Sequence, residues 1–302
     1  MAVGLVAICA CVLGGLYWYR ARVEWTPTNM VSYLPRVNAT VAYIDLEKLR
    51  DAGLLDLFVG SKALEELDYR NFVEQTGFDY RTDLDRIAIA FQGDNRFIVA
   101  RGKFDWKKIN QYSTRAGGTC HNSVCDYQHP EPPGRDLSYF PIRPTVMGLY
   151  SGPSKGGVYD LTPRRFRDAV TPSSDAPVWI SVPASQWNEA KDLPPGTKTF
   201  ASAFAEADHV LFSIDADASK SLKLYADVAC RNPEDAAKLN TRLAEATDLL
   251  RKMMAREHQT PNAKDLSGLL AGGEFKVEGS SVKAAWPLPR AFIESFASGG
   301  VN

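Results

Sequence analysis

The chain lacks the features that mark the common nucleotide-binding sites and nucleic-acid surfaces. It contains no G-x-x-x-x-G-K-[ST] loop and no G-x-G-x-x-G turn, so neither phosphate-binding motif is present. It also contains no run of like charge, and its 35 basic residues balance 36 acidic ones. Nucleic-acid-binding proteins usually carry a basic stripe, so we expect no nucleic-acid partner. No residue pattern identifies catalytic residues or a cofactor site, and we predict neither.

Cysteine is scarce as well, because the chain has five cysteines and two of them lie in the N-terminal apolar run. That number does not make a disulfide scaffold. Cys120 and Cys125 flank four residues, of which Asn122-Ser123 suits a tight turn. Facing positions of a hairpin bring Cβ atoms near disulfide distance. Cys120 and Cys125 are therefore our disulfide candidate, with free thiols as the open alternative.

The same segment offers one metal-site alternative. Two thiolates and two imidazoles can bind zinc tetrahedrally, and Cys120, His121, Cys125 and His129 supply these groups. The spacing differs from that of a common zinc finger, because four residues separate the cysteines and one histidine adjoins the first cysteine. We predict no metal site and keep this set as the alternative.

Charge is absent from residues 2–19, AVGLVAICACVLGGLYWY, and Arg20 and Arg22 follow them. This length just suffices for a helix that crosses a bilayer, which needs about 20 apolar residues. Aromatic residues at the end of the run suit the headgroup layer. We therefore predict a transmembrane anchor over residues 1–22, with the membrane contacted through residues 2–19, and a linker over residues 23–32.

Two features disagree about the side of the membrane on which the body lies. Arg20 and Arg22 follow the apolar run and favour a cytoplasmic body by the positive-inside rule. A disulfide between Cys120 and Cys125 instead favours an oxidising compartment. We predict a single-pass protein of the cell membrane with an extracytoplasmic body, and a cytoplasmic body is the alternative.

Two α+β segments follow, residues 33–160 and 161–302. Each shows a predicted strand, helix, hairpin and helix in the same order, followed by further strands. Helix starts are marked by Asp45, Asp105 and Asn232, the last followed by Pro233. The order βαββαβ is the ferredoxin-like motif. We predict an α+β fold in which a transmembrane helix precedes two ferredoxin-like halves with mainly antiparallel sheets, related by internal duplication. The strands and hairpins that carry this prediction are residues 39–44, 86–100, 177–182 and 209–229.

Several phrases resemble those of a group of uncharacterised bacterial proteins with one membrane tether and a large extracytoplasmic α+β body. The phrases are Tyr33-Leu34-Pro35, Val41-Ala42-Tyr43-Ile44-Asp45-Leu46, Asp83-Leu84-Asp85-Arg86-Ile87-Ala88 and Val99-Ala100-Arg101-Gly102-Lys103-Phe104-Asp105. The likeness covers most of residues 33–300 and consists of strand starts, helix caps and turns. It implies a tethered architecture and brings no activity with it.

We therefore expect a membrane-tethered, non-enzymatic binding or scaffolding protein, such as an accessory subunit of a membrane complex with an unidentified protein partner. Two alternatives stay open: a hydrolase or metal-dependent enzyme whose site the sequence hides, and a carrier of a small ligand or lipid between two sheets. Carboxylates and histidines clustered in a cleft would favour the enzyme. A large apolar pocket would favour the carrier, and a flat apolar patch would favour the subunit.

Overall fold

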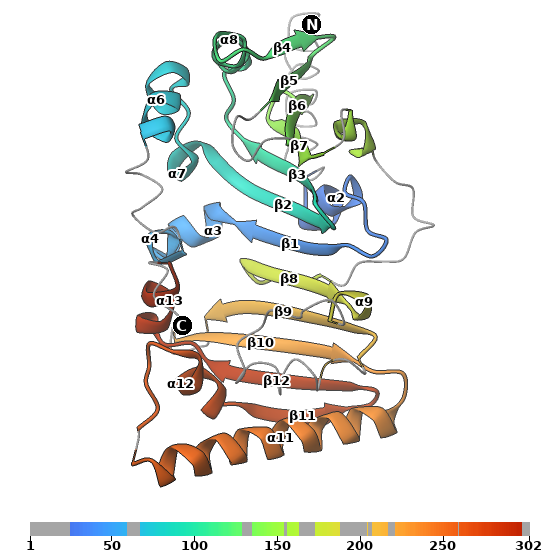
Figure 1. Ribbon diagram of the computed structural model, residues 1–302, viewed down its shortest axis with the longest axis vertical. Coiled ribbons are helices and arrows are strands. Elements are labelled where there is room, and N and C mark those ends of the chain that lie inside the picture. Colours follow the sequence, from blue (N-terminus) through green and yellow to red (C-terminus); the bar gives the residue numbers. More distant parts are fainter. Residues whose placement is uncertain are drawn as a thin grey trace, which may run out of the picture.

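A computed structural model describes residues 25–58, 67–128, 135–153, 156–162, 173–187, 204, 207–216, 221–258 and 260–297. In this part of the chain the strands form one sheet of twelve, antiparallel at every pairing (Figure 1). The order of strands is β11-β12-β10-β9-β8-β1-β2-β3-β7-β6-β5-β4. The strands are β1 (Thr40–Asp45), β2 (Leu84–Gln92), β3 (Asn95–Gly102), β4 (Thr119–His121), β5 (Val124–Gln128), β6 (Asp136–Arg143), β7 (Val146–Gly152), β8 (Val178–Pro183), β9 (His209–Ala216), β10 (Leu222–Ala229), β11 (Glu274–Glu278) and β12 (Ser281–Pro287).

Three helix starts confirm the capping predictions. The side chain of Asp45 accepts a hydrogen bond from the backbone N–H of Lys48, and Asp105 and Asn232 cap α8 and α11 in the same way. The helices are α2 (Pro27–Ser32), α3 (Leu46–Asp51), α4 (Leu55–Phe58), α6 (Leu67–Thr76), α7 (Tyr80–Asp83), α8 (Trp106–Arg115), α9 (Ala184–Trp187), α11 (Pro233–Arg256), α12 (Leu266–Ala271) and α13 (Arg290–Ala297), with a 3₁₀ turn η1 (Gly157–Asp160).

The two faces of the sheet are covered differently. One face carries α2 and η1, whose Met30 and Val158 pack with Val41, Phe97 and other buried residues of the first half. On the other face, α3 and α8 lie over the first half of the sheet. The helices α11, α12 and α13 lie over the second half of that same face, where they bury the apolar side chains of β9, β10 and β12. Two helical groups thus cover this face, and the group that contains α3 also packs against apolar side chains of the middle strands β1, β2 and β8.

The predicted fold class of a transmembrane helix before two ferredoxin-like halves is wrong. A ferredoxin-like unit is a split βαβ motif, in which a strand of the hairpin lies between the two strands that a helix connects. Here β1 pairs directly with β2, the next strand in the described chain, and on its other side with β8, which joins both segments into one sheet. Ferredoxin-like duplication is therefore not supported. The two segments do share a strand order, since β2-β3 and β9-β10 follow β1 and β8 outward from the centre.

The prediction of a transmembrane helix is also corrected by the described part of the structure. None of the helices that the structure describes combines the length and the apolar character required to cross a bilayer. Residues 2–19, on which the anchor was predicted, lie outside the described residues. The alternative of a carrier that holds its ligand between two sheets is also corrected, because the described strands form a single sheet.

Candidate functional site

The middle of the sheet has one face that is apolar and incompletely covered. Along β1 and β7, buried residues alternate with partly exposed ones. Because side chains of a strand point alternately to opposite faces, the partly exposed residues share one face. We call this set the aliphatic face. It comprises Ala42, Ile44, Ile87, Ile89, Ile98, Met147, Leu149, Val178 and Ile180.

The strand register lines these side chains up in two rows. In the first row, Ile180 faces Ala42, Ala42 faces Ile89, Ile89 faces Ile98 and Ile98 faces Leu149. The second row runs from Val178 through Ile44 and Ile87 to Ala100 and Met147. With strands about 4.8 Å apart, five strands span roughly 19 Å. The rows therefore form a continuous aliphatic strip across β8, β1, β2, β3 and β7.

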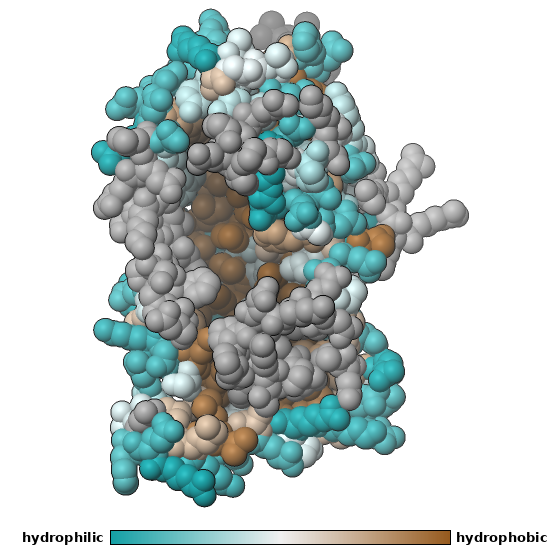
Figure 2. All heavy atoms as spheres, viewed as in Figure 1, coloured by the Kyte–Doolittle hydropathy of each residue, from teal (hydrophilic) through white to brown (hydrophobic). Residues whose placement is uncertain are grey.

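A hollow lies over this strip. Figure 2 shows hydrophobic residues gathered in a depression over the middle strands of Figure 1, with hydrophilic residues toward the upper and lower ends of the molecule. The residues on the opposite face of the same strands, such as Val41 and Val99, are completely buried. Burying apolar surface stabilises a protein by about 25 cal/mol per Å², and surface that stays exposed does not contribute this free energy. A strip left partly exposed in the centre of a sheet therefore favours a ligand that covers it.

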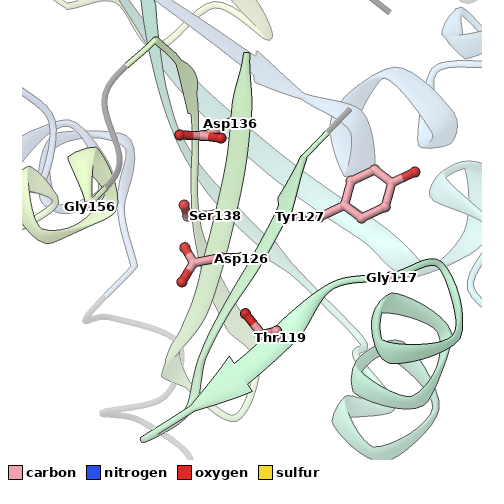
Figure 3. Close-up of a pocket in the computed structure, with 7 residues that line it drawn as sticks. All are labelled: Gly117, Thr119, Asp126, Tyr127, Asp136, Ser138 and Gly156. Carbon is pink, nitrogen blue, oxygen red and sulfur yellow. The ribbon is translucent and has the colours of Figure 1, made fainter. Parts of the chain in front are cut away.

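A polar cavity lies at the β4 end of the sheet, on the face opposite the aliphatic face. It has a volume of about 360 Å³. Asp126, Asp136, Ser138 and Thr119 project into it from β4, β5 and β6, whereas Tyr127 points away (Figure 3). The register places Asp126 opposite both Thr119 and Ser138. Gly156, just before η1, lies on the far side of the cavity.

The polar groups of this cavity are poorly satisfied. Ser138 is 1% exposed, and its Oγ has no hydrogen-bond partner in the described structure. Leaving a buried hydroxyl unpaired costs about 1–3 kcal/mol. Asp126 and Asp136 make no ion pair or hydrogen bond with the described residues, and no basic residue is among the described side chains that line the cavity. The cavity therefore presents two uncompensated carboxylates and an unpaired hydroxyl.

The predicted cysteine pair lies beside this cavity. Cys120 faces Cys125 across β4 and β5, and their sulfur atoms form a disulfide. Asn122 and Ser123 both have positive φ, which a tight two-residue hairpin turn requires. Because Thr119 and Asp126 are the neighbours of the two cysteines in the sequence, the disulfide holds these two polar residues next to each other on the opposite face.

The zinc alternative is not assembled in the described residues. The sulfur atoms of Cys120 and Cys125 bond to each other, His121 is exposed, and His129 lies outside the described residues. Across the described part of the chain, no three His, Cys, Asp or Glu side chains come together in a way that could hold a metal ion.

The structure also places serine, histidine and aspartate near one another on β8, β9 and β10. The hydroxyl of Ser181 lies 2.6 Å from Nε2 of His209. The carboxylate of Asp227 acts on His209 electrostatically and forms an ion pair with Lys283. Ser181 is completely buried, so no substrate can reach its hydroxyl. The three residue types are those of a catalytic triad. Because the serine is buried, we interpret its hydrogen bond to the histidine as structural.

Sequence reasoning missed several of these residues, although signals were present. Asp136 and Ser138 stand two apart in DLSYFPIR, a spacing that places polar side chains on one face of a strand. The residues Gly152-Pro153-Ser154-Lys155-Gly156 also match G-x-S-x-G. Ser154 lies outside the described residues, and η1 follows an antiparallel strand here, which is not the strand–turn–helix context of a nucleophile elbow.

The resemblance to tethered bacterial proteins stays a prediction, because no family model, no curated protein and no solved structure matches this chain.

Proposed function

We propose that this protein is a non-enzymatic binding protein whose aliphatic face holds a ligand with a long aliphatic chain. The observation that carries the proposal is the strip of partly exposed aliphatic side chains with a hollow over it (Figure 2). Part of the strip, including Ile44 and Ile87, also packs against the cluster that contains α3. A hollow lined in this way favours a bound apolar ligand over a flat protein–protein contact.

The backbone of the strip argues for an aliphatic chain rather than an extended peptide. β8, β1, β2, β3 and β7 each pair with a neighbour on both sides, so their backbone groups are already hydrogen-bonded. An extended peptide on this face would bury its own N–H and C=O groups without partners, which is costly. An aliphatic chain has no such groups, and its methylenes match the side chains of Ile, Leu, Val and Met.

An oxidising compartment is part of the proposal, supported by the Cys120–Cys125 disulfide. Scaffolding by the same hollow is the second candidate. An amphipathic helix satisfies its own backbone and can place apolar residues on such a surface. The two candidate functions predict different results when the chain length of the fatty acid is varied.

Binding of cis-parinaric acid to the full-length chain, followed by fluorescence, tests the proposal. We expect saturable binding and displacement by saturated fatty acids, with affinity rising about fourfold per added methylene, from about 0.8 kcal/mol per buried CH₂. The double substitution Ile89→Thr, Ile98→Thr places two hydroxyls in the strip and should weaken binding at least tenfold.

Val277→Thr is the matched control, because Val277 is an exposed apolar residue on β11, an edge strand of the sheet. It should bind like the unaltered chain, and circular dichroism should show that all variants keep the same fold. No saturable binding, or equal binding by the double variant, would contradict the proposal. Binding that does not depend on chain length would favour the scaffolding candidate.

A further inference from the structure

We propose that the polar cavity at β4, β5 and β6 is a Ca²⁺ site. Asp126 and Asp136 supply the charged ligands, and the hydroxyl oxygens of Ser138 and Thr119 supply neutral ones. This inference is independent of the proposed function, because Ser138 and Asp126 lie on the face of the sheet opposite the aliphatic face.

The positions of the two carboxylates suit one shared cation. Asp126 faces Ser138, and Asp136 stands two residues before Ser138 on the same strand, so the three side chains leave the sheet on one face. Diagonal residues of neighbouring strands have their Cα atoms about 7–8 Å apart, and carboxylates can reach toward the space between them. Figure 3 shows Ser138 between Asp126 and Asp136, all three on the same side of the strands.

The unpaired hydroxyl of Ser138 supports the cation site independently of the two carboxylates. Its hydroxyl is buried, lines the cavity and has no hydrogen-bond partner in the described structure. This buried hydroxyl lies beside the exposed carboxylate of Asp126 and the half-buried carboxylate of Asp136, and a positively charged species that accepts oxygen lone pairs suits all three groups. A cation bound there satisfies all three groups at once.

The chemistry of the donors selects the cation. All four side chains present oxygen, which hard cations prefer, whereas zinc and copper favour nitrogen and sulfur. Mg²⁺ demands near-ideal octahedral geometry at short distances, and Ca²⁺ accepts six to eight oxygens in flexible arrangements. A cavity of about 360 Å³ leaves room for water molecules to complete that coordination.

The number of carboxylates in the site sets the expected affinity for Ca²⁺. Two carboxylates are few for a Ca²⁺ site, so we expect a Kd on the order of 10⁻⁴–10⁻³ M, the range of extracellular modules. The adjacent disulfide fixes Thr119 beside Asp126. Reduction of Cys120–Cys125 should therefore weaken Ca²⁺ binding several-fold.

Isothermal titration of the full-length chain with CaCl₂, after treatment with a chelator, tests the site. We expect one ion per chain. Asp126→Asn and Asp136→Asn should each weaken binding at least tenfold, and Ser138→Ala should weaken it several-fold. Asp51→Asn, which changes an exposed carboxylate at the end of α3, is the matched control and should bind normally.

Thermal unfolding supplies a second readout, since a ligand that binds only the folded state raises Tm as its concentration rises. We expect Ca²⁺ to raise the Tm of the unaltered chain and of Asp51→Asn, and to leave that of the variant Asp126→Asn, Asp136→Asn unchanged. The site is refuted by the absence of saturable binding up to 10 mM, about tenfold above the weakest expected Kd. Equal binding by the two-asparagine variant also refutes it. Fatty-acid binding is measured separately, so failure of either proposal leaves the other standing.

Discussion

Ser181 and His209 share a hydrogen bond of 2.6 Å across β8 and β9. Ser181 is completely buried, and burial lowers the pKa of His209 below its usual 6.5, although the carboxylate of Asp227 opposes this shift. The bond thus holds a neutral imidazole against a hydroxyl in the second half of the sheet. Protonation of the ring would place a charge in this partly buried position.

The first prediction concerns pH. Between the lowered folded-state pKa of His209 and 6.5, the unfolded chain binds a proton that the folded chain does not. The free energy of unfolding should therefore be highest above pH 6.5 and fall as the pH decreases through that window. Urea unfolding at several pH values measures it. His209→Gln should flatten the dependence, and the exposed His121→Gln should not. An unchanged slope in His209→Gln would contradict the assignment.

Two buried serines should respond to alanine in opposite directions. Ser138→Ala removes an unpaired hydroxyl and should raise the free energy of unfolding by about 1 kcal/mol in the presence of a chelator. Ser181→Ala breaks the bond to His209 and should lower it by about 1 kcal/mol. Urea denaturation of both variants measures the pair. Destabilisation by Ser138→Ala would mean that its hydroxyl has a partner in solution.

Trp179 joins the two segments of the sheet. Its ring stacks on that of Tyr43, with ring centroids 5.5 Å apart, directly across the β1–β8 pairing. Trp179→Ala should lower the free energy of unfolding by about 3–5 kcal/mol because it empties a fully buried position. Val277→Ala, at the exposed edge strand, should change it by less than about 0.5 kcal/mol. Denaturation followed by circular dichroism decides between these outcomes, and a loss below about 1 kcal/mol for Trp179→Ala would contradict the prediction.

Thiol counting tests the disulfide and the compartment together. In protein isolated from its native source and denatured without reductant, we expect three reactive thiols, Cys9, Cys11 and Cys230, and five after reduction. Five thiols before reduction would refute the disulfide and point to a reducing compartment. Stoichiometric bound zinc would instead favour the set Cys120, His121, Cys125 and His129.

Local chemistry explains which elements the sequence predicts correctly. The hairpin predicted over residues 86–100 is present as β2 and β3, with Gly93 at positive φ in the turn between them. Asn232 caps α11, as the Asn-Pro pair predicts. The domain boundary near residue 160 stays a prediction.

Neither candidate site has a sequence signal of comparable strength. The aliphatic face takes one or two residues from each of five strands, and the same alternation of apolar residues occurs on strands that helices cover completely. Asp126 and Asp136 are ten positions apart and meet only because β5 and β6 pair in one particular register. A shift of that register by one residue would turn Asp126 and Ser138 away from each other.

The sequence by itself determined the elements that depend on near neighbours: strand alternation, hairpin turns, helix caps and the closeness of Cys120 and Cys125. Only the tertiary structure decided that both segments join in one sheet through Tyr43 and Trp179, where two ferredoxin-like halves were predicted. It also decided that the aliphatic face stays partly exposed and that Ser138 lies unpaired beside two carboxylates. The physical reason is that turns and caps are fixed by bonds a few residues apart, whereas strand partners and the covering of a face depend on contacts between residues far apart in the chain.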